Sequence, residues 1–239
     1  VKDAAGAGFE RISLDLIYGL DREAPERWLS ELDQVLCLPV DHLSCYMLTV
    51  EPGTPLHDRV EKGRSRDAAP DLKSTLFRKT ALFLSEKGWD HYEVSSFART
   101  RKHRSRHNSA YWQMRPYYGF GPGAHSFLDG SRSWNHADTA RYIRDLAQGN
   151  RPEAGRETPD RQARMTEQIM LGLRTRDGID IRRFEADSGV AFKRLFRPLL
   201  ELLEADGLAR WDRNDGFSLT LQGRCRLDSI VRAFVDRIC

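Results

Sequence analysis

The segment Arg106–Trp112, which reads RHNSAYW, places an imidazole, an amide and two aromatic rings close together in the chain. A neutral imidazole such as that of His107 can bind heme iron axially, and aromatic rings can pack on the face of a porphyrin. A histidine beside aromatic residues is more often structural, however. The residue types therefore leave a heme contact and a packed surface helix both open.

A second candidate is Asp15, which lies between Leu14 and Leu16 in an apolar run. A carboxylate surrounded by apolar residues needs polar partners, because its burial is otherwise costly. If the run is a strand of a βα barrel, Asp15 can accept hydrogen bonds from ribose hydroxyls at the mouth of the barrel. The alternative is a structural aspartate that caps a neighbouring loop.

Two further segments have a composition suited to binding. Residues 99–106 form a dense basic run that could bind phosphate or could simply be a solvated loop. Gly119, Gly121 and Gly123 alternate just before His125, which allows the backbone to approach a ligand closely. No Lys-Ser or Lys-Thr pair follows these glycines, so the segment is not a P-loop. A tight connection between strands explains it equally well.

The overall composition narrows the classes of protein. The formal net charge of +3 is too balanced to predict nucleic-acid binding, and no apolar run of about eighteen residues predicts a membrane span. No secretory signal is visible, so we expect a cytoplasmic protein. The cysteines are scattered without a CxxC pair, at Cys37, Cys45, Cys225 and Cys239. Neither a zinc site nor a disulfide framework is expected from them.

The elements that must position these residues alternate in the first half of the chain. Strands are predicted at residues 11–19, 42–50 and 91–96, and helices at residues 28–36 and 72–84. This βα alternation predicts a parallel sheet or part of a barrel. Further along, the sequence predicts a short hairpin at residues 127–135, turning at Asp129-Gly130, and a linker at residues 150–159.

The last third of the chain reads as a separate unit. Thr158-Pro159 predicts a helix start, and apolar helical spacing recurs at residues 165–173, 181–184, 192–203 and 227–238. Two short strands at 208–211 and 217–221 flank a turn at 214–216. This order resembles a winged-helix module. We therefore predict an α/β fold with two domains, residues 1–150 as part of a barrel and residues 158–239 as a winged-helix-like α+β domain.

Several segments, taken in order, resemble one family. They are DLIYGL at 15–20, HLSCYMLTVEPGTPL at 42–56, HYEVSSFAR at 91–99, SRHNSAYW at 105–112, GFGPGAHS at 119–126 and MLGLRTRDGID at 170–180. Their order and spacing resemble the HemW heme chaperones, which are relatives of oxygen-independent coproporphyrinogen III oxidase in the radical SAM superfamily. The resemblance extends over essentially the whole chain.

The resemblance implies cofactor contacts. Asp15 matches an acid that the relatives use to bind S-adenosylmethionine, and Thr49 and His125 fall where the relatives place further contacts to it. The family also holds a 4Fe–4S cluster on a CxxxCxxC loop, which this sequence lacks. We therefore expect the chain to be the later part of a radical SAM barrel plus the C-terminal domain, and not a competent enzyme by itself.

The resemblance also assigns the aromatic segment to heme. His107, Asn108, Tyr111 and Trp112 match the HNxxYW pattern that marks the heme chaperones, with His107 as the candidate ligand of heme iron. The function implied is heme binding and transfer to apo-hemoproteins. The alternative is an oxygen-independent coproporphyrinogen III dehydrogenase of porphyrin biosynthesis. A winged-helix nucleic-acid-binding protein is the minor alternative.

We predict that the isolated chain assembles no 4Fe–4S cluster, because its cysteines have no spacing that converges on one iron cluster. Anaerobic reconstitution with iron and sulfide, followed by quantification of iron and sulfide per chain, is the measurement. A stoichiometric cluster with the charge-transfer absorption of 4Fe–4S would contradict the prediction.

Overall fold

The computed structural model describes residues 1–212 and 215–238. Its first part contains β1 (Ser13–Tyr18) and β2 (His42–Met47), which pair in parallel, and the helices α2 (Pro25–Leu36) and α4 (Pro70–Glu86). These elements confirm the two strands and two helices predicted for this part. Two short helices were not predicted, α1 (Lys2–Gly6) and α3 (Pro55–Glu61).

The prediction of a third strand at residues 91–96 is wrong. The segment 91–96 is not one strand but the core of a hairpin, in which β3 (Asp90–His91) pairs antiparallel with β4 (Ser96–Ala98). β4 also pairs antiparallel with β2, giving the sheet order β1-β2-β4-β3. β3 runs in the same direction as β2, but the antiparallel strand β4 lies between them, so only β1 and β2 pair in parallel.

One face of this sheet is covered and the other is open. Trp28 of α2 stacks on Tyr18, with ring centroids 5.3 Å apart, and its Nε1 donates a hydrogen bond to Thr80 Oγ1 of α4 at 2.7 Å. On the open face Ile17 is 60% exposed and Tyr46 is 43% exposed. Apolar side chains are therefore exposed on the uncovered face of the sheet.

Asp15 was expected to be buried, and this was wrong. Asp15 is exposed in β1, whose side chains alternate between exposed and half-buried positions. Within the described residues β1 pairs with β2 alone, so it is an edge strand. Period-two alternation places Asp15 on the uncovered face, with Ser13 and Ile17, instead of inside a two-sided apolar layer.

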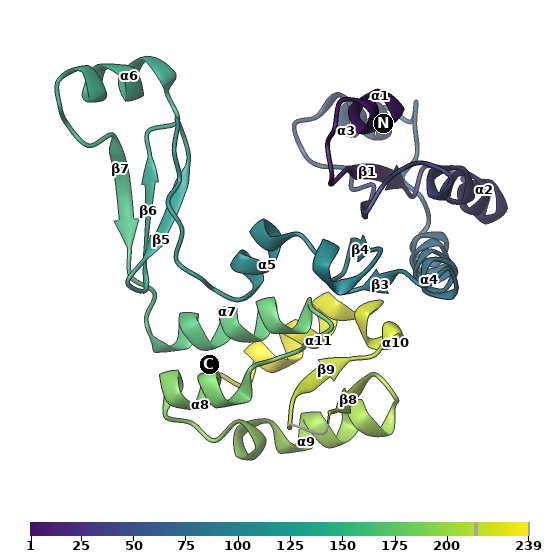
Figure 1. Cartoon of the computed structure of the whole chain (residues 1–239). Coiled ribbons are helices and arrows are strands. Elements are labelled where there is room, and N and C mark those ends of the chain that lie inside the picture. Colours follow the sequence, from purple (N-terminus) through teal and green to yellow (C-terminus); the bar gives the residue numbers. More distant parts are fainter. Residues whose placement is uncertain (213–214, 239) are drawn as a thin grey trace.

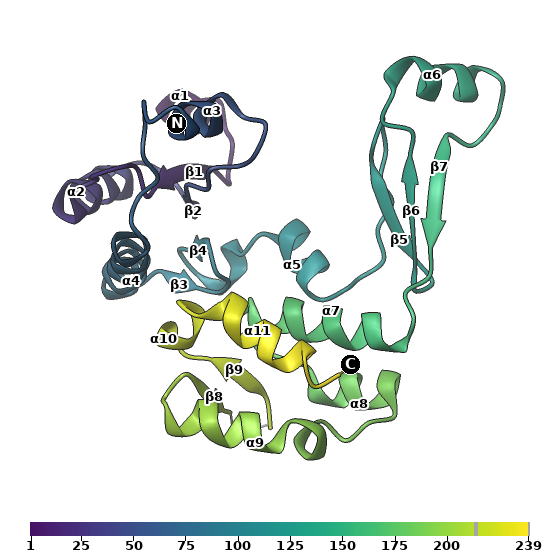
Figure 2. The same cartoon turned by 180° about the vertical axis from the view of Figure 1, so that it is seen from behind.

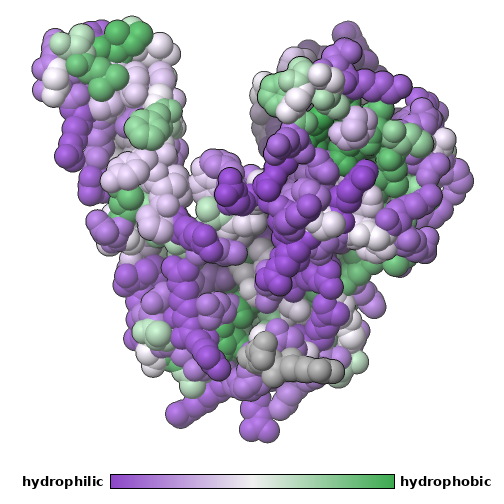
Figure 3. Space-filling view, in the orientation of Figure 1, coloured by the Kyte–Doolittle hydropathy of each residue, from purple (hydrophilic) through white to green (hydrophobic). Residues whose placement is uncertain are grey.

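A second sheet forms an arm. β5 (His125–Leu128) and β6 (Ser131–Asn135) make the predicted hairpin, and β7 (Glu153–Glu157) pairs with β6. The expected linker at residues 150–159 is therefore largely a strand of this sheet. The helix α6 (Thr139–Ala147) lies at the tip of the arm, away from the rest of the molecule (Figure 1), and its exposed Ile143 and Leu146 contribute to the apolar surface seen there in Figure 3.

The C-terminal part is built from helices around a short hairpin. Its elements are α7 (Arg161–Leu173), α8 (Ile181–Ser188), α9 (Phe192–Ala205), β8 (Ala209–Trp211), β9 (Phe217–Leu219), α10 (Leu221–Arg224) and α11 (Leu227–Val235). The order matches the predicted winged-helix-like module. α7 begins two residues later than expected, because the carboxylate of Asp160, not Thr158, accepts the backbone N–H of Ala163. Part of the turn predicted at 214–216 lies outside the described residues.

Each part has its own apolar core. In the C-terminal part, Phe184, Phe192, Phe196 and Phe234 are fully buried, and their rings contact one another at centroid distances of 4.9–6.1 Å. Aromatic contacts of this kind add to the free energy gained by burying the rings. The core of the N-terminal part centres on Leu32, Leu43, Leu76, Leu84 and Phe97.

The two parts meet where β3 lies beside α10 and α11, as both views show (Figures 1 and 2). Asp90 of β3 accepts hydrogen bonds from Arg104 Nε at 2.7 Å and from Arg176 Nη1 at 2.8 Å. Arg176 also donates its backbone N–H to the carbonyl of Tyr92. No helix among the described residues is long and apolar enough to cross a membrane.

We predict that a fragment of residues 158–239 folds by itself, because the phenylalanine core lies within it. A cooperative thermal transition by circular dichroism is expected, at a lower temperature than in the whole chain because Asp90 is lost. Phe196→Ala should cost the fragment about 3–5 kcal/mol, whereas Leu202→Ala on the exposed side of the same helix should cost little. A flat, non-cooperative melt of the unsubstituted fragment would contradict the prediction.

A second prediction concerns His91, which is buried and stacks on Phe97 with ring centroids 4.2 Å apart. Burial, helped by the charge of Arg224, lowers its pKa from 6.5 to about 3. Between these two pKa values the unfolded chain binds a proton at His91 and the folded chain does not. The free energy of unfolding must therefore fall as the pH drops from about 6.5 toward 3. One such group accounts for about 1.4 kcal/mol per pH unit.

His91→Phe keeps a stacked ring and removes the titrating group, so urea unfolding between about pH 6 and pH 4.5 should show a shallower fall in stability than the parent chain. The matched control is His57→Phe, because His57 lies on the surface helix α3. Parallel stability curves for the parent and His91→Phe would contradict the prediction.

Candidate functional site around helix α5

The helix α5 (Arg106–Trp112) carries the aromatic segment singled out from the sequence, and Ser105 starts it. Ser105 Oγ accepts the backbone N–H of Asn108 at 3.2 Å, which satisfies one of the free donors at a helix N-terminus. The preceding 3-10 turn, η1 (Arg101–His103), follows directly from β4. The start of α5 is therefore fixed by a side-chain cap and by a short connection to the first sheet.

A chain of hydrogen bonds ties this cap to the strands. The backbone N–H of Ser105 donates to the hydroxyl of Tyr92 at 3.2 Å, and this hydroxyl lies 2.7 Å from His42 Nε2. His42 Nδ1 lies 2.9 Å from Ser13 Oγ on β1. Burial lowers the pKa of His42, against the charge of Asp15. Sequence reasoning missed His42 and Tyr92, although both lie in the motifs HLSCYMLTV and HYEVSS.

A cavity of about 400 Å³ lies between the open face of the sheet and the start of α5. Asp15, Ser44 and Tyr46 line it from the strands, and Arg106 and Asn108 line it from the helix. The structure thus brings together Asp15 and Asn108, which the sequence had assigned to different ligands. Carboxylate, hydroxyl and amide groups around one small cavity suit a ligand rich in hydroxyl groups.

His107 and Tyr111 form a second face of the helix. Their rings lie edge to face with centroids 4.8 Å apart, and Tyr111 continues the contact to Tyr117 at 4.6 Å. His107 is exposed, and within the described residues no hydrogen bond involves its ring nitrogens. An exposed imidazole supported by an aromatic ring is free to bind a metal-bearing ligand.

Trp112 faces a different environment. It lines a larger cavity of about 1080 Å³ between α5 and the C-terminal part, and the guanidinium of Arg174 lies 5.5 Å from its ring centroid. Its Nε1 is buried and finds no acceptor among the described residues. The four residues of HNxxYW therefore do not share one surface: His107 contacts Tyr111, Asn108 lines the Asp15 cavity, and Trp112 lines the larger cavity.

The other candidates lie apart from this helix. Thr49 is exposed two residues beyond the end of β2, and it is not among the residues that line the Asp15 cavity. His125 begins β5 in the arm and stacks on Trp134, with centroids 5.8 Å apart. Arg104, a candidate partner for heme propionates, is already held by Asp90 and Asp177, whereas Arg106 is exposed.

The described cysteines do not fit an iron–sulfur cluster. Cys37 is exposed at the end of α2, Cys45 is buried in β2 and Cys225 is half-buried after α10. Burial raises the pKa of Cys45 to about 12, which disfavours the thiolate that binds iron. Of these three thiols only that of Cys45 is buried, and Cys239 lies outside the described residues.

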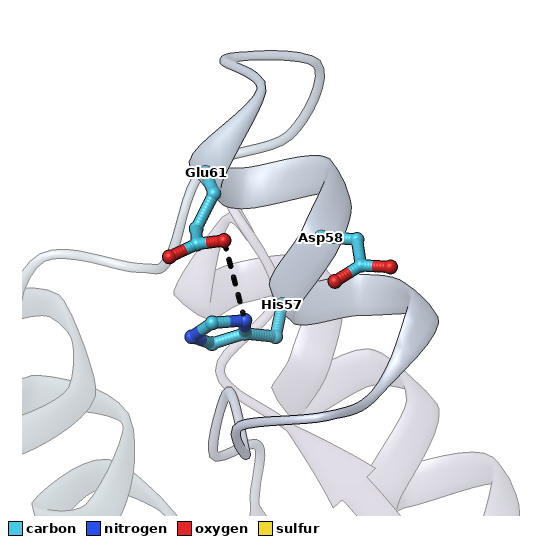
Figure 4. Close-up of side chains that lie close together, drawn as sticks. All are labelled: His57, Asp58 and Glu61. Carbon is cyan, nitrogen blue, oxygen red and sulfur yellow. Dashed lines mark ion pairs between the residues drawn. The ribbon is translucent and has the colours of Figure 1, made fainter.

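One cluster of possible metal ligands lies away from α5. His57, Asp58 and Glu61 project from the short surface helix α3 (Figure 4), with ligand atoms within 4.8 Å of one another. His57 Nδ1 lies 3.9 Å from Glu61 Oε2. Two of the three side chains are exposed, and i,i+4 pairs of this kind are common on helix surfaces. We assign no ion to this cluster.

Residues 160–225 match the model of the HemN C-terminal domain. The chain is 34% identical over 233 residues to the heme chaperone HemW of Mycobacterium tuberculosis. The alignment covers 98% of this chain and 57% of that protein. It is 30% identical over 231 residues to the heme chaperone HemW of Bacillus subtilis, covering 97% of this chain and 60% of that protein.

A solved structure has the same fold. The coproporphyrinogen III oxidase HemN from Escherichia coli, described as a radical SAM enzyme, aligns with a TM-score of 0.70 at 21% identity, over 98% of this chain and 56% of that chain. This likeness confirms the predicted α/β class with its winged-helix-like module. The chain spans less than two thirds of the curated relatives it matches. Within that span, the chain is similar in sequence to the HemW heme chaperones and has the fold of HemN.

Proposed function

We propose that this chain supplies the heme-contacting part of a HemW-like heme chaperone, which binds heme and transfers it to apo-hemoproteins in the cytoplasm. The observation that carries the proposal is the exposed imidazole of His107, set edge to face against Tyr111 on a capped helix. The similarity to curated heme chaperones over nearly the whole chain supports it. Heme is the cargo in this proposal.

The residues of α5 fit this role in different ways. We assign His107 as the ligand of heme iron and Tyr111 as the ring that packs on the porphyrin, because the two share one face. Asn108 and Trp112 are assigned to heme through the motif alone, since they face the cavities on either side of the helix. Of the two basic candidates for the propionates, Arg106 is the one left exposed.

The cavity at Asp15 fits the second cofactor of the family. We propose that Asp15 accepts hydrogen bonds from hydroxyl groups of S-adenosylmethionine there. Thr49 and His125 do not line this cavity, so their assignment as further contacts rests on the family resemblance alone. This cofactor, with the iron–sulfur cluster, supplies radical chemistry in radical SAM proteins generally. The described cysteines provide no ligand set for the cluster. The HNxxYW pattern at residues 107–112 favours the heme chaperone over the alternative, coproporphyrinogen III dehydrogenase.

Helix α9 does not offer the basic face that the nucleic-acid alternative requires. On α9 the charges are mixed, since Arg197 Nε lies 2.9 Å from Glu201 and Lys193 Nζ lies 3.1 Å from Asp215. A helix that reads DNA needs a basic face toward the phosphates. We therefore keep the prediction that nucleic acid is not a partner.

We predict that His107→Ala weakens heme binding about tenfold or more and shifts the Soret band, because the axial imidazole is lost. The measurement is a hemin titration of the whole chain, followed by absorption. His57→Ala is the matched control, since it also removes a surface imidazole from a seven-residue helix. Its Soret position and affinity should equal those of the parent.

Thermal melting of His107→Ala separates the ligand role from a structural one. An unchanged melting temperature with a shifted Soret band supports ligation, whereas a large loss of stability with an unchanged Soret band contradicts it. His103→Ala tests the neighbouring imidazole, which lies 3.0 Å from Thr100 Oγ1 through its Nδ1. A loss of heme affinity in His103→Ala alone would overturn the assignment to His107.

A further inference from the structure

A cleft of about 850 Å³ lies at the junction of the two parts, away from the Asp15 cavity. The end of α4 and the strand β3 form one wall, and β9 with α10 forms the other. Its lining is rich in guanidinium groups, from Arg101, Arg104, Arg176, Arg210 and Arg224. They come from four separate segments, so only the tertiary fold gathers them.

The acids in this cleft are already engaged. Asp90 is held by Arg104 and Arg176 at 2.7 and 2.8 Å, and Asp177 lies 3.2 Å from Arg104. His91, which also lines the cleft, adds no positive charge near neutral pH because burial lowers its pKa to about 3. The arginines in the lining therefore outnumber the carboxylates, and the cleft carries an excess of positive charge.

Arg224 is the inner arginine of the cleft. Its Nε and Nη1 are buried and have no acceptor among the described residues. The carboxylate of Glu93 acts on Arg224 from a distance, but the two form no ion pair within 4 Å, and Glu93 Oε1 accepts a hydrogen bond from Ser95 instead. Burial, together with the charges of Arg210 and Arg176, lowers the pKa of Arg224 to about 10.

The backbone holds this arginine in place. Arg224 ends α10, and its backbone N–H donates to the carbonyl of Thr220. Gly223 beside it packs so closely on Leu208 that a Cβ would meet the Leu208 carbonyl oxygen. This close packing holds the backbone of α10 against Leu208 at the position from which the Arg224 side chain extends. A buried cation without an acceptor costs free energy, and an anion that supplies oxygens would remove that cost.

We propose that this cleft binds a ligand bearing a diphosphate group. Phosphate oxygens accept paired hydrogen bonds from guanidinium groups, and a ligand with two anionic centres can meet Arg224 inside the cleft and Arg210 at its rim. Leu82, Trp89 and Leu221 line the same cleft, so a phosphorylated molecule with an apolar or aromatic part also fits. The site is distinct from the proposed heme contact on α5.

The test uses the whole chain with pyrophosphate, ADP and citrate, followed by calorimetry and thermal melting. Pyrophosphate or ADP should bind and raise the melting temperature, and Arg224→Gln should weaken that binding about tenfold or more. Tighter binding of ADP than of pyrophosphate identifies a nucleotide as the source of the diphosphate. Arg226→Gln is the matched control, because Arg226 is exposed and does not line the cleft.

A second readout distinguishes a binding arginine from a structural one. Without anion, Arg224→Gln should melt at the same temperature as the parent or higher, because an unpaired buried cation has been removed. If Arg224→Gln does not fold, Arg210→Gln on the exposed side of β8 should still weaken pyrophosphate binding. The proposal is overturned if neither diphosphate binds at about 5 mM, if citrate binds as well as they do, or if neither substitution changes the affinity.

Discussion

The Asp90 carboxylate links the two parts of this protein and helps to fix the position of α5 between them. Its two oxygens accept hydrogen bonds from Arg104, just before α5, and from Arg176, just after α7. Burial alone would raise the pKa of Asp90, but the hydrogen bonds and charges of the two arginines outweigh it and lower the pKa. Because the carboxylate is only 16% exposed, these bonds are screened less than surface ion pairs. The sheet, α5 and the C-terminal part are thereby joined at one residue.

Fixing α5 in this way has a direct consequence for binding. A seven-residue helix has little stability of its own, so its orientation comes from the Ser105 cap and from the segment that Asp90 holds. Once oriented, the helix presents His107 and Tyr111 to solvent, Asn108 to the Asp15 cavity and Trp112 to the C-terminal part. A single motif in the sequence thus serves several surfaces.

The same junction creates the arginine cleft. Gathering five guanidinium groups between two cores is unfavourable unless acids or anions offset the charge. Asp90 and Asp177 do so for Arg104 and Arg176, but two buried nitrogens of Arg224 find no acceptor among the described residues. The junction is therefore both the mechanical link between the parts and the place where an anion would stabilise them.

The sequence by itself determined much of the local structure. Apolar spacing located α2, α4 and α9, and Asp129-Gly130 located the hairpin of the arm, because such signals act over a few residues. The order of motifs identified the family. The predictions from the sequence were wrong where pairing between distant segments decides the structure. β4 pairs antiparallel with β2, and β7 forms a strand within the segment that was predicted to be a linker.

Only the tertiary structure decided the site. Whether Asp15 is buried depends on which strands cover β1, and the sequence of β1 carries no record of its neighbours. His42 and Tyr92 join the site through hydrogen bonds between residues about fifty positions apart. Burial, together with the charges of Arg210 and Arg176 from other segments, lowers the pKa of Arg224. Burial and charge are properties of the assembled neighbourhood, which forms only when distant segments pack together.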